Sequence, residues 1–182
     1  MRADERSVEL VVDAEHFQTV VLDGICRAKV SIDIMTADFK AMLVPGAGRR
    51  APSIVDHFRR LAEKGVEIRL LHAGVPSSAA LQELRRELPR NLTIRRCPRL
   101  HSKAVLIDSA WLYLGSANLT GAGLGAKGDT RRNFEMGIAT ESTDLIDRVM
   151  TEFNALWEGH HCKGCGRRDV CPVPLEEPRL VA

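Results

Sequence analysis

Four polar side chains stand in two short pairs on either side of an apolar stretch. His101 and Lys103 are two residues apart, and so are Ser116 and Asn118 further along the chain. An imidazole titrates near neutral pH and can serve as a nucleophile or an acid, whereas an ammonium and an amide donate hydrogen bonds to anionic oxygens. A set of these groups that contains no carboxylate is suited to binding a phosphate.

The sequence between the two pairs predicts a β-hairpin. Two apolar runs are separated there by only two residues, 109 and 110. A two-residue turn at this point would place Lys103 opposite Ser116 and His101 opposite Asn118. Because side chains alternate between the faces of a strand, all four polar groups would meet on one face at the open end of the hairpin.

These residues form the pattern H-x-K-x4-D-x6-G-S-x-N, made by His101, Lys103, Asp108, Gly115, Ser116 and Asn118. The pattern resembles the signature of the phospholipase D superfamily, and a looser resemblance extends over residues 14–157. Its aspartate stands beside the predicted turn, away from the other polar groups, so we expect Asp108 to have a structural role. The resemblance implies an α/β fold with a mixed β-sheet flanked by helices.

The resemblance also implies a two-step cleavage of phosphodiesters that needs no metal or other cofactor for catalysis. His101 would be the nucleophile, forming a covalent phosphohistidine, or the acid that protonates the leaving oxygen. Lys103 and Asn118 would hold the phosphoryl oxygens, and Ser116 would support the site by hydrogen bonding. An acidic residue beyond the signature often orients the histidine in this family, and Glu135 is the candidate here.

The family mechanism uses two such motifs, and this chain carries one. Of the other five histidines, four have no lysine two residues later, and His161, which has Lys163 at that spacing, is followed neither by the aspartate nor by the G-S-x-N of the signature. We therefore expect a homodimer in which two copies of His101 face each other across a two-fold axis. Dimers of this kind resemble small nucleases, which favours DNA or RNA as the substrate. A phospholipase or other small-phosphodiester hydrolase, and a nucleic-acid-binding module with little turnover, are the alternatives.

Charge is distributed unevenly along the chain. The region 95–132 carries a net charge of +5, whereas the rest of the chain carries −3. A basic zone around the signature suits a nucleic-acid backbone, because affinity for nucleic acids comes largely from contacts to phosphates. Arg99, Arg131 and Arg132 are the candidates for binding phosphates that flank the reacting one.

The last part of the chain is rich in cysteine and predicts a metal site. Three cysteines form the pattern C-x2-C-x5-C, at Cys162, Cys165 and Cys171. A structural zinc ion needs a fourth ligand, which Cys97, His160 or His161 could supply. The same spacing with a remote cysteine also resembles the ligand set of an iron–sulfur cluster.

The wider sequence predicts one α/β domain with an appendage. Strands are expected at 30–36, 66–72, 92–97, 103–108, 111–115 and 134–140, and helices at 14–29, 53–64, 77–88 and 142–157. We expect a catalytic domain over residues 1–158 and a metal-binding tail over 159–182. No apolar run is long enough to span a membrane and no secretory signal is visible, so a cytoplasmic location is expected.

Overall fold

A computed structural model describes residues 8–44, 51–84 and 88–171 of the 182-residue chain. A seven-stranded sheet forms its centre, in the order β1-β7-β6-β5-β2-β3-β4. β2, β3 and β4 run parallel, and each remaining neighbouring pair is antiparallel. The strands are β1 (Val8–Val12), β2 (Ser31–Thr36), β3 (Glu67–His72), β4 (Leu92–Arg96), β5 (Ala104–Ile107), β6 (Trp111–Gly115) and β7 (Met136–Thr140). The predicted mixed α/β fold is confirmed.

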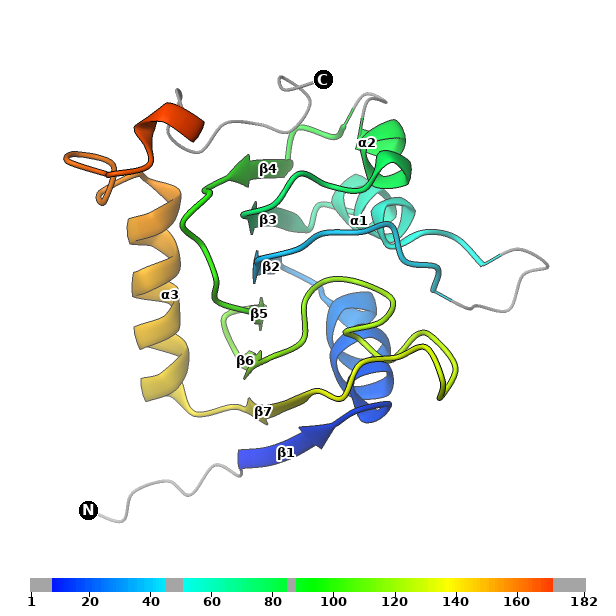
Figure 1. Cartoon of the computed structure of the whole chain (residues 1–182). Coiled ribbons are helices and arrows are strands. Elements are labelled where there is room, and N and C mark those ends of the chain that lie inside the picture. The colour runs from blue at the N-terminus through cyan, green and yellow to red at the C-terminus, as the bar shows by residue number, and fades with distance from the viewer. Residues whose placement is uncertain (1–7, 45–50, 85–87, 172–182) are drawn as a thin grey trace, which may run out of the picture.

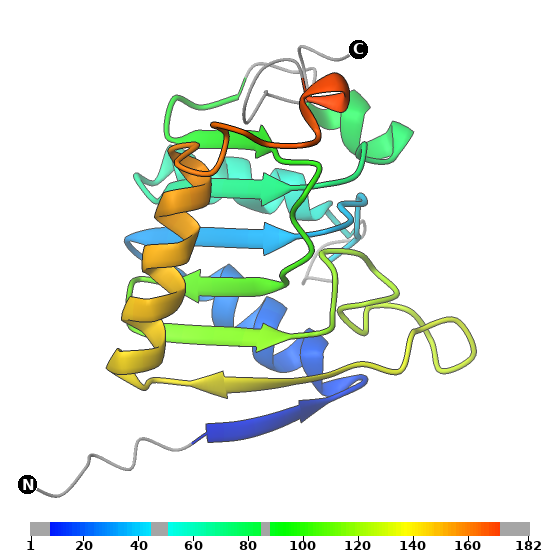
Figure 2. The same ribbon diagram turned by 60° about the vertical axis from the view of Figure 1, so that its left-hand side comes forward.

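Helices cover both faces of the sheet (Figure 1). One face carries the π-helix η1 (Phe17–Gly24) with the 3-10 turn η2 (Ile25–Arg27), α1 (Ile54–Glu63) and α2 (Ser78–Leu84). The long helix α3 (Thr143–Trp157) crosses the other face, and the short η3 (Arg168–Val170) follows it (Figure 2). Within the described residues, no helix is long and apolar enough to cross a membrane.

Side chains of the central strands alternate between two buried faces, which explains why the helices form two layers. Ile32 and Ile34 of β2 belong to the core beneath η1 and α1, whereas Met35 belongs to the core beneath α3. Every residue of β5 is buried, as expected for a strand with helices on both faces. Ser53 begins α1 as predicted, because its hydroxyl accepts a hydrogen bond from the N–H of Asp56 at 3.1 Å.

An ion pair lies between the sheet and α3. The guanidinium of Arg69 on β3 binds both carboxylate oxygens of Asp33 on β2, at 2.7 and 2.8 Å. The same guanidinium donates to the side chain of Asn154 on α3 at 3.0 Å and lies 4.8 Å from the ring centre of Phe153. This planar group therefore links two strands and the helix that covers them.

His72, at the end of β3, makes stability sensitive to acid. It is fully buried, with Nδ1 2.7 Å from the backbone oxygen of Gly74. Burial lowers the pKa of His72 to about 4; the charge of Arg96 acts in the same direction, against the hydrogen bond to Gly74. The unfolded chain therefore binds a proton between the ordinary histidine pKa and pH 4, while the folded chain does not.

We expect the free energy of unfolding to fall as the pH drops through this window, by up to about 1.4 kcal/mol per pH unit from His72 alone. Urea unfolding of the wild type and of His72→Gln at several pH values measures this difference. His160→Gln, at an exposed histidine, is the control that should keep the wild-type slope. Equal slopes for the wild type and His72→Gln would contradict the prediction.

Candidate active site

His101 and Lys103 lie on the segment that leads into β5. The Lys103 ammonium donates to the backbone oxygen of His101 at 2.7 Å, and its Nζ lies 3.3 and 3.4 Å from the two ring nitrogens. Leu100, buried just before them, anchors the segment, while the imidazole is exposed. A phosphate at this point of the surface could contact the imidazole and the ammonium together.

The hairpin brings the other half of the signature to the same end, in a register one residue away from the prediction. The backbone N–H of Gly115 donates to the oxygen of Lys103 at 3.1 Å, so Lys103 lies opposite Gly115 and not opposite Ser116. The predicted register was wrong because the turn contains three residues, 108–110, of which the first two adopt positive φ angles of 53° and 52°. His101 and Asn118 lie beyond the paired residues of the two strands, so the hairpin register does not set them opposite each other.

Asp108 lies at the closed end of the hairpin, far along β5 from the histidine. Its carboxylate accepts hydrogen bonds from the backbone N–H groups of Lys29, Val30 and Ser31 at 2.7 to 3.1 Å. Partial burial acts to raise the pKa of Asp108, but these N–H groups and the charge of Lys29 hold it below its ordinary value. Asp108 therefore fastens the start of β2 to the turn.

Gly115 is required by the close approach of an aromatic side chain. A Cβ atom at Gly115 would lie 2.3 Å from the hydroxyl of Tyr113, and one at Gly137 would lie 2.4 Å from the same ring. The buried Tyr113 hydroxyl is held 2.8 Å from Nε2 of His16, and it accepts the N–H of Ala117 at 3.3 Å. The glycine of the signature thus makes room for a tyrosine that supports the backbone before the asparagine.

Ser116 and Glu135 are joined directly. The Ser116 hydroxyl donates to Oε2 of Glu135 and accepts the N–H of Met136 at 3.1 Å. The side chain of Asn133 donates to Oε1 of the same carboxylate at 3.0 Å, and Glu135 is buried. Within the described part of one chain, the hydrogen bonds of this carboxylate go to Ser116 and Asn133 and not to His101.

Asn118 fastens the end of β2 to the site. Its Oδ1 accepts the backbone N–H groups of Ala37 and Asp38 at 3.1 and 3.0 Å, which leaves the amide nitrogen as the donor end of the side chain. Thr36, which the sequence reasoning missed, accepts the N–H of Leu119 at 2.9 Å and is buried. A hydroxyl at the last position of the SIDIMT strand was the available signal.

The sequence model of the family described as "Cardiolipin synthase, PLD-like domain" matches residues 21–157, most of the chain. The chain belongs to this phospholipase D-like family. Because the match includes the complete signature, the chain is a phosphodiester hydrolase of the phospholipase D type. No curated protein matches the sequence closely enough to count as a relative.

Solved structures show the same phospholipase D-like fold. NucT from Helicobacter pylori superposes with a TM-score of 0.64 at 17% identity, over 85% of this chain and 97% of that one. Nuc from Salmonella typhimurium, a phospholipase D family member, gives 0.64 at 20% identity, over 85% and 95%. The archaeal chromatin protein TrmBL2 gives 0.54 at 13% identity, over 86% of this chain and 54% of that one.

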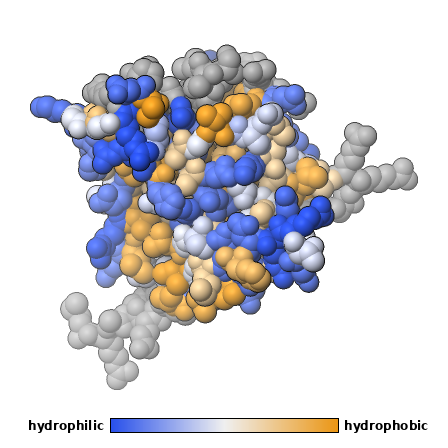
Figure 3. All heavy atoms as spheres, in the orientation of Figure 1, coloured by the Kyte–Doolittle hydropathy of each residue, from blue (hydrophilic) through white to orange (hydrophobic). Residues whose placement is uncertain are grey.

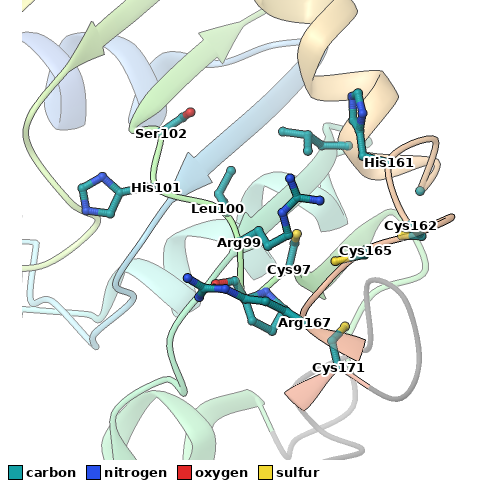
Figure 4. Close-up of a pocket in the computed structure, with 13 residues that line it drawn as sticks. Cys97, Arg99, Leu100, His101, Ser102, His161, Cys162, Cys165, Arg167 and Cys171 are labelled. Atoms are coloured by element: carbon teal, nitrogen blue, oxygen red, sulfur yellow. The ribbon is translucent and has the colours of Figure 1, made fainter. Parts of the chain in front are cut away.

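The candidate phosphate-binding arginines of the phospholipase D-like domain differ in their surroundings. Arg131 is exposed on the segment between β6 and β7. Arg132 forms an ion pair with Asp129, which offsets part of its charge. Arg99 is exposed two residues before His101 and also lines a cavity on the other side of its segment (Figure 4). Arg131 and Arg99 are therefore the better placed of the three to meet a ligand.

The predicted metal ligands of the tail lie around that same cavity. Cys97, Cys162, Cys165 and Cys171 line it together with His161, whereas His160 is exposed and stands 2.9 Å from a carboxylate oxygen of Glu158. Among the described residues, no three His, Cys, Asp or Glu side chains stand close enough to hold a metal ion as they are placed. The structure thus gathers the four sulfurs at one place without forming a closed ligand set.

Proposed function

We propose that this chain is a nuclease that cleaves DNA or RNA through a covalent phosphohistidine at His101, working as a homodimer without a catalytic metal. The observation that carries the proposal is the exposed pairing of His101 with Lys103, whose Nζ lies 3.3 Å from the ring. It stands at the end of the sheet to which Asn118 and the Ser116–Glu135 pair also belong.

The proposed reaction has two balanced steps. A ring nitrogen of His101 attacks phosphorus, and the P–O bond to the leaving group breaks as the partner subunit's His101 gives that oxygen a proton. Water then attacks the phosphorus of the phosphohistidine, the P–N bond breaks, and the water passes a proton to the same partner imidazole, which restores both rings. Lys103 and the amide nitrogen of Asn118 donate to the phosphoryl oxygens, where negative charge increases in each transition state.

An exposed apolar surface beside the site supports the homodimer. Leu10, Met136 and Phe134 are 61%, 64% and 92% exposed, and Leu114 is 37% exposed. Leu10 and Leu114 both pair with Ile138, so Leu10, Ile138 and Leu114 lie in a row across β1, β7 and β6. Helix α3 leaves this part of its face uncovered (Figure 2), and apolar residues gather in the lower part of Figure 3, where β7 and β1 lie. A second copy that covers this surface would approach the site end of the sheet.

Basic surface near the histidine supports a nucleic acid as the substrate. Arg99, Lys127 and Arg131 are exposed. Arg95 instead donates to the backbone oxygen of Trp157 at 2.8 Å, and its guanidinium lies 4.5 Å from the centre of the Trp157 ring. Arg95 therefore has a structural role. The likeness to Nuc, to NucT and to TrmBL2, whose structure is described as showing a novel mode of DNA binding, agrees with this choice. Contacts to phosphates predict cleavage with little sequence preference that weakens as salt is raised.

A substrate panel in the presence of EDTA tests this function. Single-stranded DNA, double-stranded DNA, RNA, phosphatidylcholine and cardiolipin are each incubated with the purified protein, the lipids being included because the family description names cardiolipin. We expect at least one nucleic acid to be cleaved and the lipids to remain intact. Cleavage of a lipid alone would contradict the proposal, and so would tight nucleic-acid binding without cleavage.

A further inference from the structure

Four cysteines from two distant parts of the chain surround one cavity. Cys97 follows β4, whereas Cys162, Cys165 and Cys171 follow α3. All four line a cavity of about 310 Å³ (Figure 4). In that view the cysteine side chains lie on one side of the segment that carries His101, and the imidazole projects to the other side. His101 and Ser102 also line the cavity, so it adjoins the proposed phosphate site, with the cysteines and the imidazole on opposite sides of the shared segment.

In the tail, the cysteine side chains are partly buried, whereas the apolar side chain of Val170 is exposed. Between 160 and 171, each described side chain other than the three cysteines is exposed, and these three are half-buried. Val170, which would be expected inside a small apolar core, is 56% exposed. The tail thus turns its sulfurs inward, an arrangement that hydrophobic burial alone does not explain.

Hydrogen bonds to the backbone fix the segments that carry the cysteines. The N–H of Cys165 donates to the oxygen of Cys162 at 3.2 Å, and Gly164 between them has a φ of 72°, which a tight turn of this kind requires. Cys97 is fixed by its N–H, which donates to the oxygen of His72 at 2.8 Å. The guanidinium of Arg167 donates to the oxygen of Pro98 at 3.0 Å and ties the tail to the Cys97 segment.

We propose that Cys97, Cys162, Cys165 and Cys171 bind one structural zinc ion. Four thiolates are a common tetrahedral ligand set for structural zinc, and the pair Cys162 and Cys165 has the usual C-x2-C spacing. Five residues separate Cys165 from the third cysteine, so the set lacks the closely repeated C-x2-C-x2-C run of bacterial iron–sulfur ligands. Since metal binding is coupled to the folding of small sites, the sulfurs close on the ion as they lose their protons.

Two arginines balance the charge of the proposed site. Zinc with four thiolates carries a net charge of −2, and Arg99 and Arg167 line the same cavity. The bound ion would join the tail to residues 97–100 and so fix the segment that carries His101. It takes no part in the phosphoryl chemistry, so this inference does not depend on the proposed function.

The metal content of serine variants tests the site. Wild-type protein, Cys97→Ser, Cys165→Ser and Cys26→Ser are purified without oxygen, and zinc, iron and acid-labile sulfide are measured. Cys26 is the matched control, because it is also half-buried but lies 3.9 Å from His57 on the opposite face of the sheet. We expect about one zinc per chain in the wild type and in Cys26→Ser, and most of it to be lost from the other two variants.

Circular dichroism shows whether each serine variant is folded. Where a variant folds poorly, cobalt spectroscopy of the wild type provides a second test of the site. Wild-type protein reconstituted with Co²⁺ should show intense thiolate-to-cobalt charge transfer and the visible bands of a tetrahedral site. His161→Ala should keep both the zinc and the spectrum. The proposal is overturned by a wild type that binds neither metal, by iron with sulfide in place of zinc, or by zinc that depends on His161 and not on Cys97.

Discussion

Replacing His101 by asparagine is expected to lower kcat for phosphodiester cleavage by at least about 10⁴-fold, because the variant lacks both the nucleophile and the proton donor. Asparagine is similar in size and is polar, and the imidazole is exposed, with its ring nitrogens 3.3 and 3.4 Å from Nζ of Lys103. Folding and assembly should therefore be unchanged. Single-turnover kinetics on the substrate found in the panel measure the loss.

His160→Asn is the matched control for this variant, because His160 is exposed and pairs with the surface carboxylate of Glu158. Its activity should equal that of the wild type. Residual cleavage by His101→Asn within tenfold of the wild-type rate would exclude the phosphohistidine mechanism.

Mixed dimers extend the same prediction to the two-fold arrangement. When wild-type and His101→Asn chains are unfolded together and refolded at equal amounts, random assembly leaves about one quarter of the dimers with two imidazoles. The activity of the mixture should therefore be about one quarter of the activity of the same total amount of wild-type protein. A fall to one half would mean that each subunit works by itself, which would contradict a shared site.

Removing the Asp108 carboxylate is expected to have the largest effect on stability. Asp108→Ala leaves three backbone N–H groups at the start of β2 without the acceptor they have in the wild type, and each such loss costs roughly 1 kcal/mol or more. We expect the free energy of unfolding to fall by about 3 kcal/mol in urea titrations. The positive φ at position 108 adds to the penalty, because aspartate tolerates it better than alanine.

Asp129→Ala is the matched control, since Asp129 is an exposed carboxylate of the same basic region that forms a surface ion pair with Arg132. Its effect should stay within about 0.5 kcal/mol of the wild type. Should Asp108→Ala prove equally mild, the carboxylate would not be what fastens β2 to the turn.

The strand and helix order was predictable wherever hydrophobic periodicity was strong. β2, β3 and β5 are buried runs between turn residues, and the cap at Ser53 sits where its type and position indicated. β1 was missed because its first three residues are exposed and an edge strand has little pattern. The helical spacing of residues 14–29 was recognised, but nothing in it distinguishes the π-helix η1 from an α-helix.

The residues of the candidate site were predictable because their types and spacing form a signature, but their contacts were not. The register depended on two positive φ angles in the turn, which the Asp108-Ser109 sequence permits without demanding. The partners of Asn118 are backbone groups of residues 37 and 38, some 80 positions away. Such contacts follow from the topology that places β5 beside β2, and the spacing of residues along the sequence does not predict them.

The ion pair beneath α3 has a consequence for where the chain's last segment can go. If the helix slipped along the sheet by one turn, Asn154 and Phe153 would leave the guanidinium of Arg69, and a charge shielded from water would lose part of its solvation. These contacts therefore fix the position of α3 along the sheet. Residues 158–171 continue directly from Trp157, so the ion pair between Arg69 and Asp33 also fixes the point at which the cysteine-bearing segment leaves the sheet.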